Sequence, residues 1–244
     1  MLKRRLVLLP LRERAMPESA SRNKTSNRIL SRLSREDFDL LGPHLEAIDL
    51  PVRKSLEASK KRIDQVYFLE AGFASVVANG GGKPGIEVGI IGREGMTGLA
   101  VVLGIDRASH ETYIQVAGNG LRISAANLRE AIENSRSLHR HMLQYAHAFL
   151  LQTTTTALAN GRSKAEERLA RWLLMANDRI DGKEVALTHE FLGLMLGTHR
   201  PGVTIALQAL AREGLIDTRR RRITILHRKK LEKRANGAYV PAGG

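Results

Sequence analysis

The chain has 244 residues, 43% of them hydrophobic and 26% charged, and its formal net charge at pH 7 is +14. A positive charge of this size favours a polyanionic partner, and no apolar run approaches the roughly 20 residues that span a bilayer, so nucleic acid is favoured over a membrane. The absence of cysteine excludes disulfides, thiol nucleophiles and thiolate-bound metal centres.

The N-terminal segment, residues 1–27, is basic, polar and without apolar periodicity, so we expect a disordered tail there. It contains a short apolar run at residues 6–9, which Pro10 ends too early for the hydrophobic segment of a secretory signal. We therefore expect a cytoplasmic protein.

A helix and then a domain of strands are predicted next. The helix covers residues 29–45, with a start signal at Ser34. From about residue 50 to residue 123 apolar residues recur with a period of two, and glycines interrupt the pattern. The clearest strands are predicted at residues 66–69, 74–77, 86–91 and 113–117. Short strands separated by glycine turns predict an antiparallel barrel or jelly roll.

A short helix is predicted over residues 124–133, and a much longer one from Ser137 to about Asn160. One stripe of the long helix alternates in spacing between four and three residues. Its members are Leu138, Met142, Tyr145, Phe149, Gln152, Thr156 and Ala159. This spacing is typical of a coiled-coil seam, so we favour a parallel homodimer. Packing of this helix against its own strand domain is the alternative.

A hinge is expected at residues 160–163, where glycine and polar residues interrupt the helical pattern. Ser163 and Glu166 fit a capping box, in which each side chain satisfies the backbone N–H of the other residue. A new helix is therefore predicted to start here and to run from Glu167 to Ile180.

The segment at residues 185–226 has the order helix, tight turn, helix and basic hairpin, which is typical of a winged helix-turn-helix. Thr188 can cap the first helix and Thr198 the second. Gly197 falls at the turn, where glycine reaches a positive φ without a steric penalty. The inward stripe of the second helix is predicted to be Val203, Leu207 and Leu210.

The partner of such a motif is duplex DNA, because the N-terminal part of the second helix meets base edges in the major groove. Arg200 is the best candidate for a bidentate contact to guanine. The predicted DNA-binding residues are Thr188, His199, Arg200, Gly202, Thr204, Gln208, Arg219, Arg220, Arg221 and Arg222. Further phosphate contacts are expected from Arg228, Lys229, Lys230, Lys233 and Arg234.

This layout resembles the Crp/Fnr family of bacterial transcription regulators. The family's helix-turn-helix pattern is matched by Thr188, Leu192, Gly193, Gly197, Arg200 and Val203. The resemblance covers residues 29–226 and implies an α+β fold. Its parts are an antiparallel, cyclic-nucleotide-binding-like β-roll at residues 28–134, a dimerisation helix and hinge at 135–162, a winged helix-turn-helix at 163–228 and a basic tail at 229–244. The family's guanine-reading arginine falls on Arg200, and Pro201 replaces the acidic residue that often follows it.

The sensor half departs from the pattern of family members that bind cyclic nucleotides. Leu99 stands where those members have the ribose-binding glutamate, and Ser109 stands at the phosphate-binding arginine, with Arg107 two residues earlier. The resemblance implies a candidate effector pocket at Gly98, Leu99, Arg107, Ser109, Thr153 and Thr154. Without the carboxylate, the ribose hydroxyls would stay unpaired. We therefore expect no cofactor and favour an unknown small-molecule effector, or none, over a cyclic nucleotide.

Three functions compete on these grounds. The favoured one is a homodimeric, sequence-specific transcription regulator on palindromic duplex DNA, with RNA polymerase as a candidate further partner. A nonspecific or architectural nucleic-acid binder would use the same charge. An enzyme is not expected, because the sequence has no H-E-x-x-H, G-x-S-x-G or phosphate-loop motif.

Overall fold

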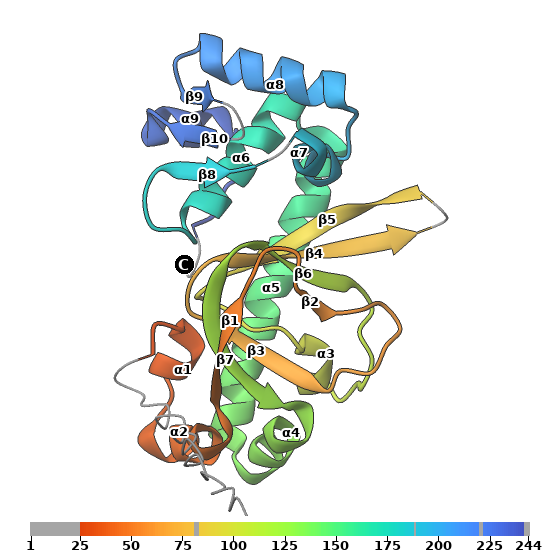
Figure 1. Cartoon of the computed structure of the whole chain (residues 1–244), viewed down its shortest axis with the longest axis vertical. Helices are drawn as coiled ribbons and strands as arrows, with labels where there is room; N and C mark the ends of the chain where they lie inside the picture. The colour runs from red at the N-terminus through yellow and green to blue at the C-terminus, as the bar shows by residue number, and fades with distance from the viewer. Residues whose placement is uncertain (1–24, 81–82, 188, 220–221, 242–244) are drawn as a thin grey trace, which may run out of the picture.

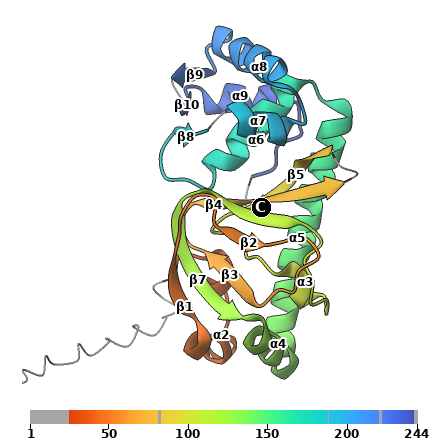
Figure 2. The same cartoon turned by 45° about the vertical axis from the view of Figure 1, so that its right-hand side comes forward.

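The computed structural model describes residues 25–80, 83–187, 189–219 and 222–241. The chain forms a β-roll and a C-terminal helical domain, and one long helix, α5, runs beside both of them (Figures 1 and 2). No helix in these described ranges is both long and apolar enough to cross a membrane. The expected N-terminal tail lies outside the described residues up to residue 24.

The roll is built from two antiparallel sheets, as predicted. One has the strand order β1-β7-β3 and the other the order β2-β6-β4-β5. The strands are β1 Glu46–Leu50, β2 Ser55–Glu57, β3 Gln65–Leu69, β4 Phe73–Gly80, β5 Lys83–Ile91, β6 Glu111–Val116 and β7 Gly118–Ser124. Gly120 in β7 allows close pairing, since a Cβ there would clash with the carbonyl oxygen of Phe68.

Short helices close one end of the roll. They are α1 Arg28–Ser31, α2 Arg35–Leu41 with a 3-10 turn at Gly42–His44, and α4 Ala125–Asn134, while α3 Leu99–Val102 lies in the β5–β6 connection. The single helix predicted over residues 29–45 is thus divided, because the Ser34 side chain accepts the Asp37 N–H and starts a new helix.

Asn27, which was expected in the tail, is instead a buried anchor. Its side-chain oxygen accepts the N–H groups of Ile29 and Leu30 at the start of α1. Its amide nitrogen donates to the carbonyl oxygens of Leu69 and Gly95, each at 2.8 Å. The polar composition of the tail gave no signal for this contact.

The stripe that was predicted to form a coiled-coil seam lies on the long helix α5, Arg136–Arg162, but it has a different partner from the one predicted. The seam residues pack against the chain's own roll: Leu138 and Met142 are fully buried. Further along the stripe, Gln152 donates to the carbonyl of Ile90 and accepts the Ile90 N–H. The spacing identified an apolar stripe correctly, but a stripe does not specify its partner. The helix has a second apolar face, which is exposed and carries Leu143, Leu150, Leu151 and Leu158.

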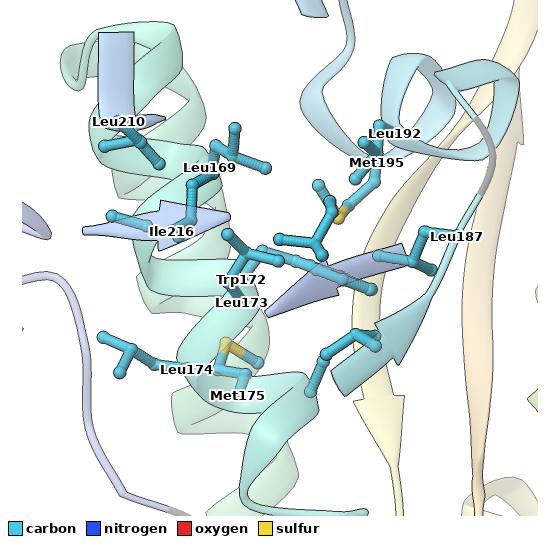
Figure 3. Close-up of a cluster of buried hydrophobic side chains, with 14 of the residues drawn as sticks. Leu169, Trp172, Leu173, Leu174, Met175, Leu187, Leu192, Met195, Leu210 and Ile216 are labelled. Atoms are coloured by element: carbon cyan, nitrogen blue, oxygen red, sulfur yellow. The ribbon is translucent and has the colours of Figure 1, made fainter. Parts of the chain in front are cut away.

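The C-terminal domain has a helical core and a small sheet of order β8-β10-β9. Its elements are α6 Ala165–Asn177, β8 Glu184–Ala186, α7 His189–Leu196, α8 Arg200–Arg212, β9 Ile216–Arg219, β10 Arg222–Ile225 and α9 Arg228–Arg234. Leu169, Leu173, Leu192 and Leu210 meet in its core (Figure 3). The N-cap of α6 is Lys164, one residue after the predicted Ser163, since Glu167 rather than Glu166 accepts its backbone N–H, and the helix ends at Asn177 rather than Ile180.

The two domains meet around Trp172 of α6. Its ring packs edge-on against Phe73 of β4 and Phe191 of α7, with centroid distances of 6.0 and 5.6 Å. Its indole N–H donates to Glu87 Oε1 of β5 at 2.5 Å. Nearby, Arg179 and Glu94 form a buried ion pair at 2.6 Å. A mostly buried polar and aromatic interface therefore joins the β-roll to the C-terminal domain.

Burial raises the pKa of Glu87 to about 7, although the hydrogen bond from Trp172 and the charges of Arg171 and Arg179 oppose this shift. The second carboxyl oxygen, Oε2, is buried and has no hydrogen-bond partner among the described atoms. The interface thus contains a carboxyl group that titrates near neutral pH.

Candidate nucleic-acid interface

The turn between α7 and α8 has the geometry that the sequence predicted. Gly197 has a φ of 57°, a left-handed conformation that favours glycine. The Thr198 N–H donates to the Gly193 carbonyl at 3.0 Å, and a Cβ on Gly193 would lie 3.1 Å from the Thr198 carbonyl oxygen. Both glycines therefore let the two helices join through a tight turn.

Helix α8 begins one residue later than expected. His199, not Thr198, is its N-cap residue, and the His199 side chain makes no capping hydrogen bond. Pro201 lies in the first turn, where its missing N–H costs little. Gly202 is a packing residue, since a Cβ there would lie 2.5 Å from Thr198 Oγ1.

The two faces of α8 differ sharply. Val203, Leu207 and Leu210 are buried in the domain core, which confirms the predicted inward stripe. Arg200 and Gln208 are exposed on the other side, and Thr204 is half-buried with its hydroxyl donating to the Arg200 carbonyl at 3.1 Å. In both views α8 lies at the end of the molecule farthest from the roll, so its outer face is open to a large partner (Figures 1 and 2).

Ile205 is a candidate contact residue that was not predicted. It lies on α8 and is 63% exposed. An isoleucine within an apolar run gives no sequence signal of exposure. On a helix in the major groove, an exposed apolar side chain of this kind can contact a thymine methyl group.

The hairpin of β9 and β10 brings further arginines to the surface. Arg219 pairs with Asp217 at 3.0 Å and Arg222 with Glu184 at 3.1 Å. All four side chains of these pairs are largely exposed, so solvent screening makes the pairs weak and leaves the arginines available to phosphate. Three other predicted DNA-binding residues, Thr188, Arg220 and Arg221, lie outside the described residues.

The predicted basic tail from residue 229 begins with a helix of the domain itself, α9. Leu231 and Ala235 are fully buried at α9 and its C-cap. Arg228 pairs with Asp178 at 2.6 Å, and Arg234 pairs with Glu213 at 3.2 Å and with Glu166 at 3.3 Å. These two arginines are therefore held within the domain, whereas Lys229, Lys230 and Lys233 are exposed. This helix was not predicted, because its sequence is a run of charged residues with only a few apolar residues, which face inward.

The residues of the candidate effector pocket have different surroundings. Gly98 has a positive φ, and its N–H donates to Glu57 Oε1 at 2.9 Å. The exposed Arg107 donates to the Lys60 carbonyl at 3.1 Å. Among the described residues, no hydrogen bond or ion pair joins Arg107 to Gly98 or to α5.

The other residues of the candidate effector pocket lie on different elements of the structure. Leu99 is the first residue of α3, and Ser109 is exposed at the surface. Thr153 and Thr154 donate their hydroxyls to the Leu150 carbonyl of their own helix. Sequence reasoning also missed Glu57, whose carboxylate takes the Gly98 N–H and the Thr112 hydroxyl.

Comparisons with known proteins agree with this architecture. The model of the Crp-like helix-turn-helix domain matches residues 167–234. No curated protein matches the chain. Among solved structures, FixK2 from Bradyrhizobium japonicum is 16% identical with a TM-score of 0.65, over 78% of this chain and 96% of that one.

Two further solved structures are similar over most of their length. A Crp/Fnr-family transcriptional regulator from Eubacterium rectale is 16% identical with a TM-score of 0.68, over 86% of this chain and 98% of that one. A CRP-family transcriptional regulator from Thermus thermophilus is 18% identical with a TM-score of 0.65, over 81% of this chain and 100% of that one. Residues 167–234 are thus identified as a Crp-like helix-turn-helix domain, and the chain as a whole shares the fold of these transcription regulators.

Proposed function

We propose that the protein is a homodimeric, sequence-specific regulator that binds palindromic sites on duplex DNA in the cytoplasm. The observation that carries this is the two-faced helix α8, with Val203 and Leu207 buried and Arg200 exposed at its start. A two-fold dimer would place two such helices about one DNA turn, roughly 34 Å, apart, and its site would be a palindrome.

The proposed dimer surface is the exposed apolar face of α5. Leu143, Leu150 and Leu158 are 40%, 57% and 57% exposed, and their spacings of seven and eight residues keep them on one side of the helix. This side is opposite the stripe that packs on the roll. A second copy of the same helix is the occupant we favour, because a self-complementary stripe at near-heptad spacing suits a two-fold pair of helices.

Replacing Leu150 by Glu is expected to weaken the dimer by about 3 kcal/mol or more, roughly 100-fold in Kd, because each interface would then hold two buried like charges. Sedimentation velocity over a range of protein concentrations measures this change. The matched control is Val52→Glu, at a residue that is 53% exposed between β1 and β2. An unchanged monomer–dimer equilibrium in Leu150→Glu would place the interface elsewhere.

Sequence is read, in this proposal, by the outer face of α8. Arg200 contacts a guanine edge, Ile205 contacts a thymine methyl group, and Thr204 and Gln208 lie beside them. Arg219 and Arg222 of the hairpin contact phosphates, which adds affinity and salt dependence without specificity.

Arg200→Ala is expected to weaken binding to a preferred duplex by about 1–3 kcal/mol and to relax the preference at one base position. Fluorescence anisotropy with the preferred duplex and its single-base variants measures both effects. Arg212→Ala is the control, since it removes an exposed positive charge from the other end of the same helix. If Arg200→Ala weakened binding equally on every duplex, Arg200 would be a phosphate contact instead.

The sensor domain, in this proposal, does not respond to cyclic nucleotides. Leu99 offers no carboxylate to a ribose, and the Gly98 N–H already has the Glu57 carboxylate as its acceptor. An incoming phosphate would therefore meet a carboxylate at that position, and like charges repel. Saturable binding of cyclic AMP in equilibrium dialysis would contradict this part of the proposal.

A further inference from the structure

A cavity of about 410 Å³ lies between the two domains, away from the candidate effector pocket. Its walls come from α1, the loop after β5, α5, α6 with the residues that follow it, and the segment after α9. Its apolar and aromatic lining includes Ile29, Tyr145, Ala148, Phe149 and Met175. None of the six residues of the candidate effector pocket contributes to it. A volume in this range and a mostly apolar wall are typical of small-molecule sites.

The charged groups around the cavity are mostly positive. They comprise four arginines and a single glutamate: Arg28, Arg32, Arg171, Arg179 and Glu94. The glutamate forms the buried ion pair with Arg179 at 2.6 Å. Because Glu94 already compensates Arg179, it does not neutralise Arg171, and the cavity favours an anion at that residue.

Arg171 is the cation best placed to hold such an anion. It is 6% exposed, and its Nε donates to the Ala238 carbonyl at 2.9 Å. Its Nη2 donates to Thr156 Oγ1 at 3.0 Å and to the Gln152 carbonyl at 3.5 Å. These acceptors are all neutral, and no carboxylate within the described part of the chain forms an ion pair with Arg171. A buried guanidinium without a counter-ion is costly, and a bound anion would remove much of that cost.

The electrostatics of Arg171 agree with this geometry. Burial lowers its pKa to about 10, and the nearby positive charge of Arg179 acts in the same direction, while Glu87 opposes both. The guanidinium is therefore less stable as a cation here than in water. A ligand carboxylate beside it would reverse that effect.

We propose that this cavity binds a small organic carboxylate with an apolar body. Its carboxylate pairs with Arg171, and its body packs against Phe149 and Met175. The ligand would touch α5 of the sensor half and α6 of the DNA-binding domain together. This assigns a ligand class and a site that the proposed function does not require.

Isothermal titration calorimetry on the full chain, without DNA, tests the site with pairs of probes matched in shape. The acids are phenylacetate, 2-naphthoate and decanoate, and the neutral partners are their amides. We expect at least one acid to bind at one per chain, about tenfold or more tighter than its amide, because only the acid pairs with Arg171. Equal affinity of every acid and its amide, or no binding by any acid, would overturn the proposal.

Two variants locate the binding. Ala148→Trp fills the cavity from α5 without removing any contact of Arg171, and it is expected to abolish binding of the acid. Ala126→Trp on the exposed surface of α4 is the matched control and should bind normally. Arg171→Gln should reduce the affinity of the acid to that of its amide. Undiminished binding by Ala148→Trp would place the ligand elsewhere, while the DNA-binding proposal would stand.

Discussion

Replacing Trp172 by Ala is expected to lower the free energy of unfolding by about 3–5 kcal/mol, the range for truncating a buried aromatic residue. Trp172 is the only tryptophan in the sequence and is 3% exposed. It contacts Phe73 of the roll and Phe191 of α7, so its loss opens a cavity where the two domains meet. Urea denaturation followed by circular dichroism measures the change without relying on the tryptophan signal.

Trp172→Phe separates packing from hydrogen bonding. The smaller ring keeps much of the aromatic contact but leaves Glu87 without its indole donor. We expect a smaller loss than in Trp172→Ala, about 1–3 kcal/mol, which is the cost of one unsatisfied buried polar group. If the free energy of unfolding of Trp172→Ala were within about 0.5 kcal/mol of that of the native protein, as for surface variants, Trp172 would not be a packing residue in solution.

Glu87→Gln is expected to stabilise the protein at pH 8 by up to about 3 kcal/mol, the equivalent of a pKa raised from 4.5 to about 7. Between pH 4.5 and about pH 7, the native state binds more protons at Glu87 than the unfolded chain does. The contribution of Glu87 to stability is therefore fully present below about pH 4.5, falls as the pH rises, and is lost above about pH 7. A glutamine does not titrate, so the stability of the variant does not decrease in this way as the pH rises.

Unfolding temperatures of the native protein and Glu87→Gln between pH 4.5 and pH 8 measure the effect. The two proteins should converge at the acidic end and diverge towards pH 8. Glu111→Gln is the control, since Glu111 is exposed on β6 and should not change the profile. Parallel profiles for all three proteins would mean that Glu87 titrates normally.

The sequence predicted those features that local chemistry determines. Alternation and glycine turns revealed the roll, and the inward stripe of Val203, Leu207 and Leu210 revealed α8. Gly197 marked the turn, because few other residues adopt its φ without strain. Some strands were not predicted, because they are too short or too poor in apolar residues to show a period of two. Examples are β2 Ser55–Glu57 and the glycine-rich β7 Gly118–Ser124.

Features that depend on tertiary contacts could not be predicted. The stripe of Leu138 and Met142 looked like a dimer seam because periodicity identifies an apolar face without naming its partner. Arg228 and Arg234 were predicted as phosphate contacts because the carboxylates that hold them within the domain include distant ones, at Asp178 and Glu166. The interdomain cavity around Arg171 is likewise assembled from five separate segments of the chain.

Selection of binding sites from random duplex DNA, at fixed salt and with no added ligand, tests the central claim most directly. The native protein is expected to enrich a palindrome whose half-sites lie about one helical turn apart, and this is the signature of a two-fold dimer with α8 in the major groove. Strong but sequence-independent retention of DNA would contradict that account. It would indicate a nonspecific, architectural binder that acts through its positive charge alone.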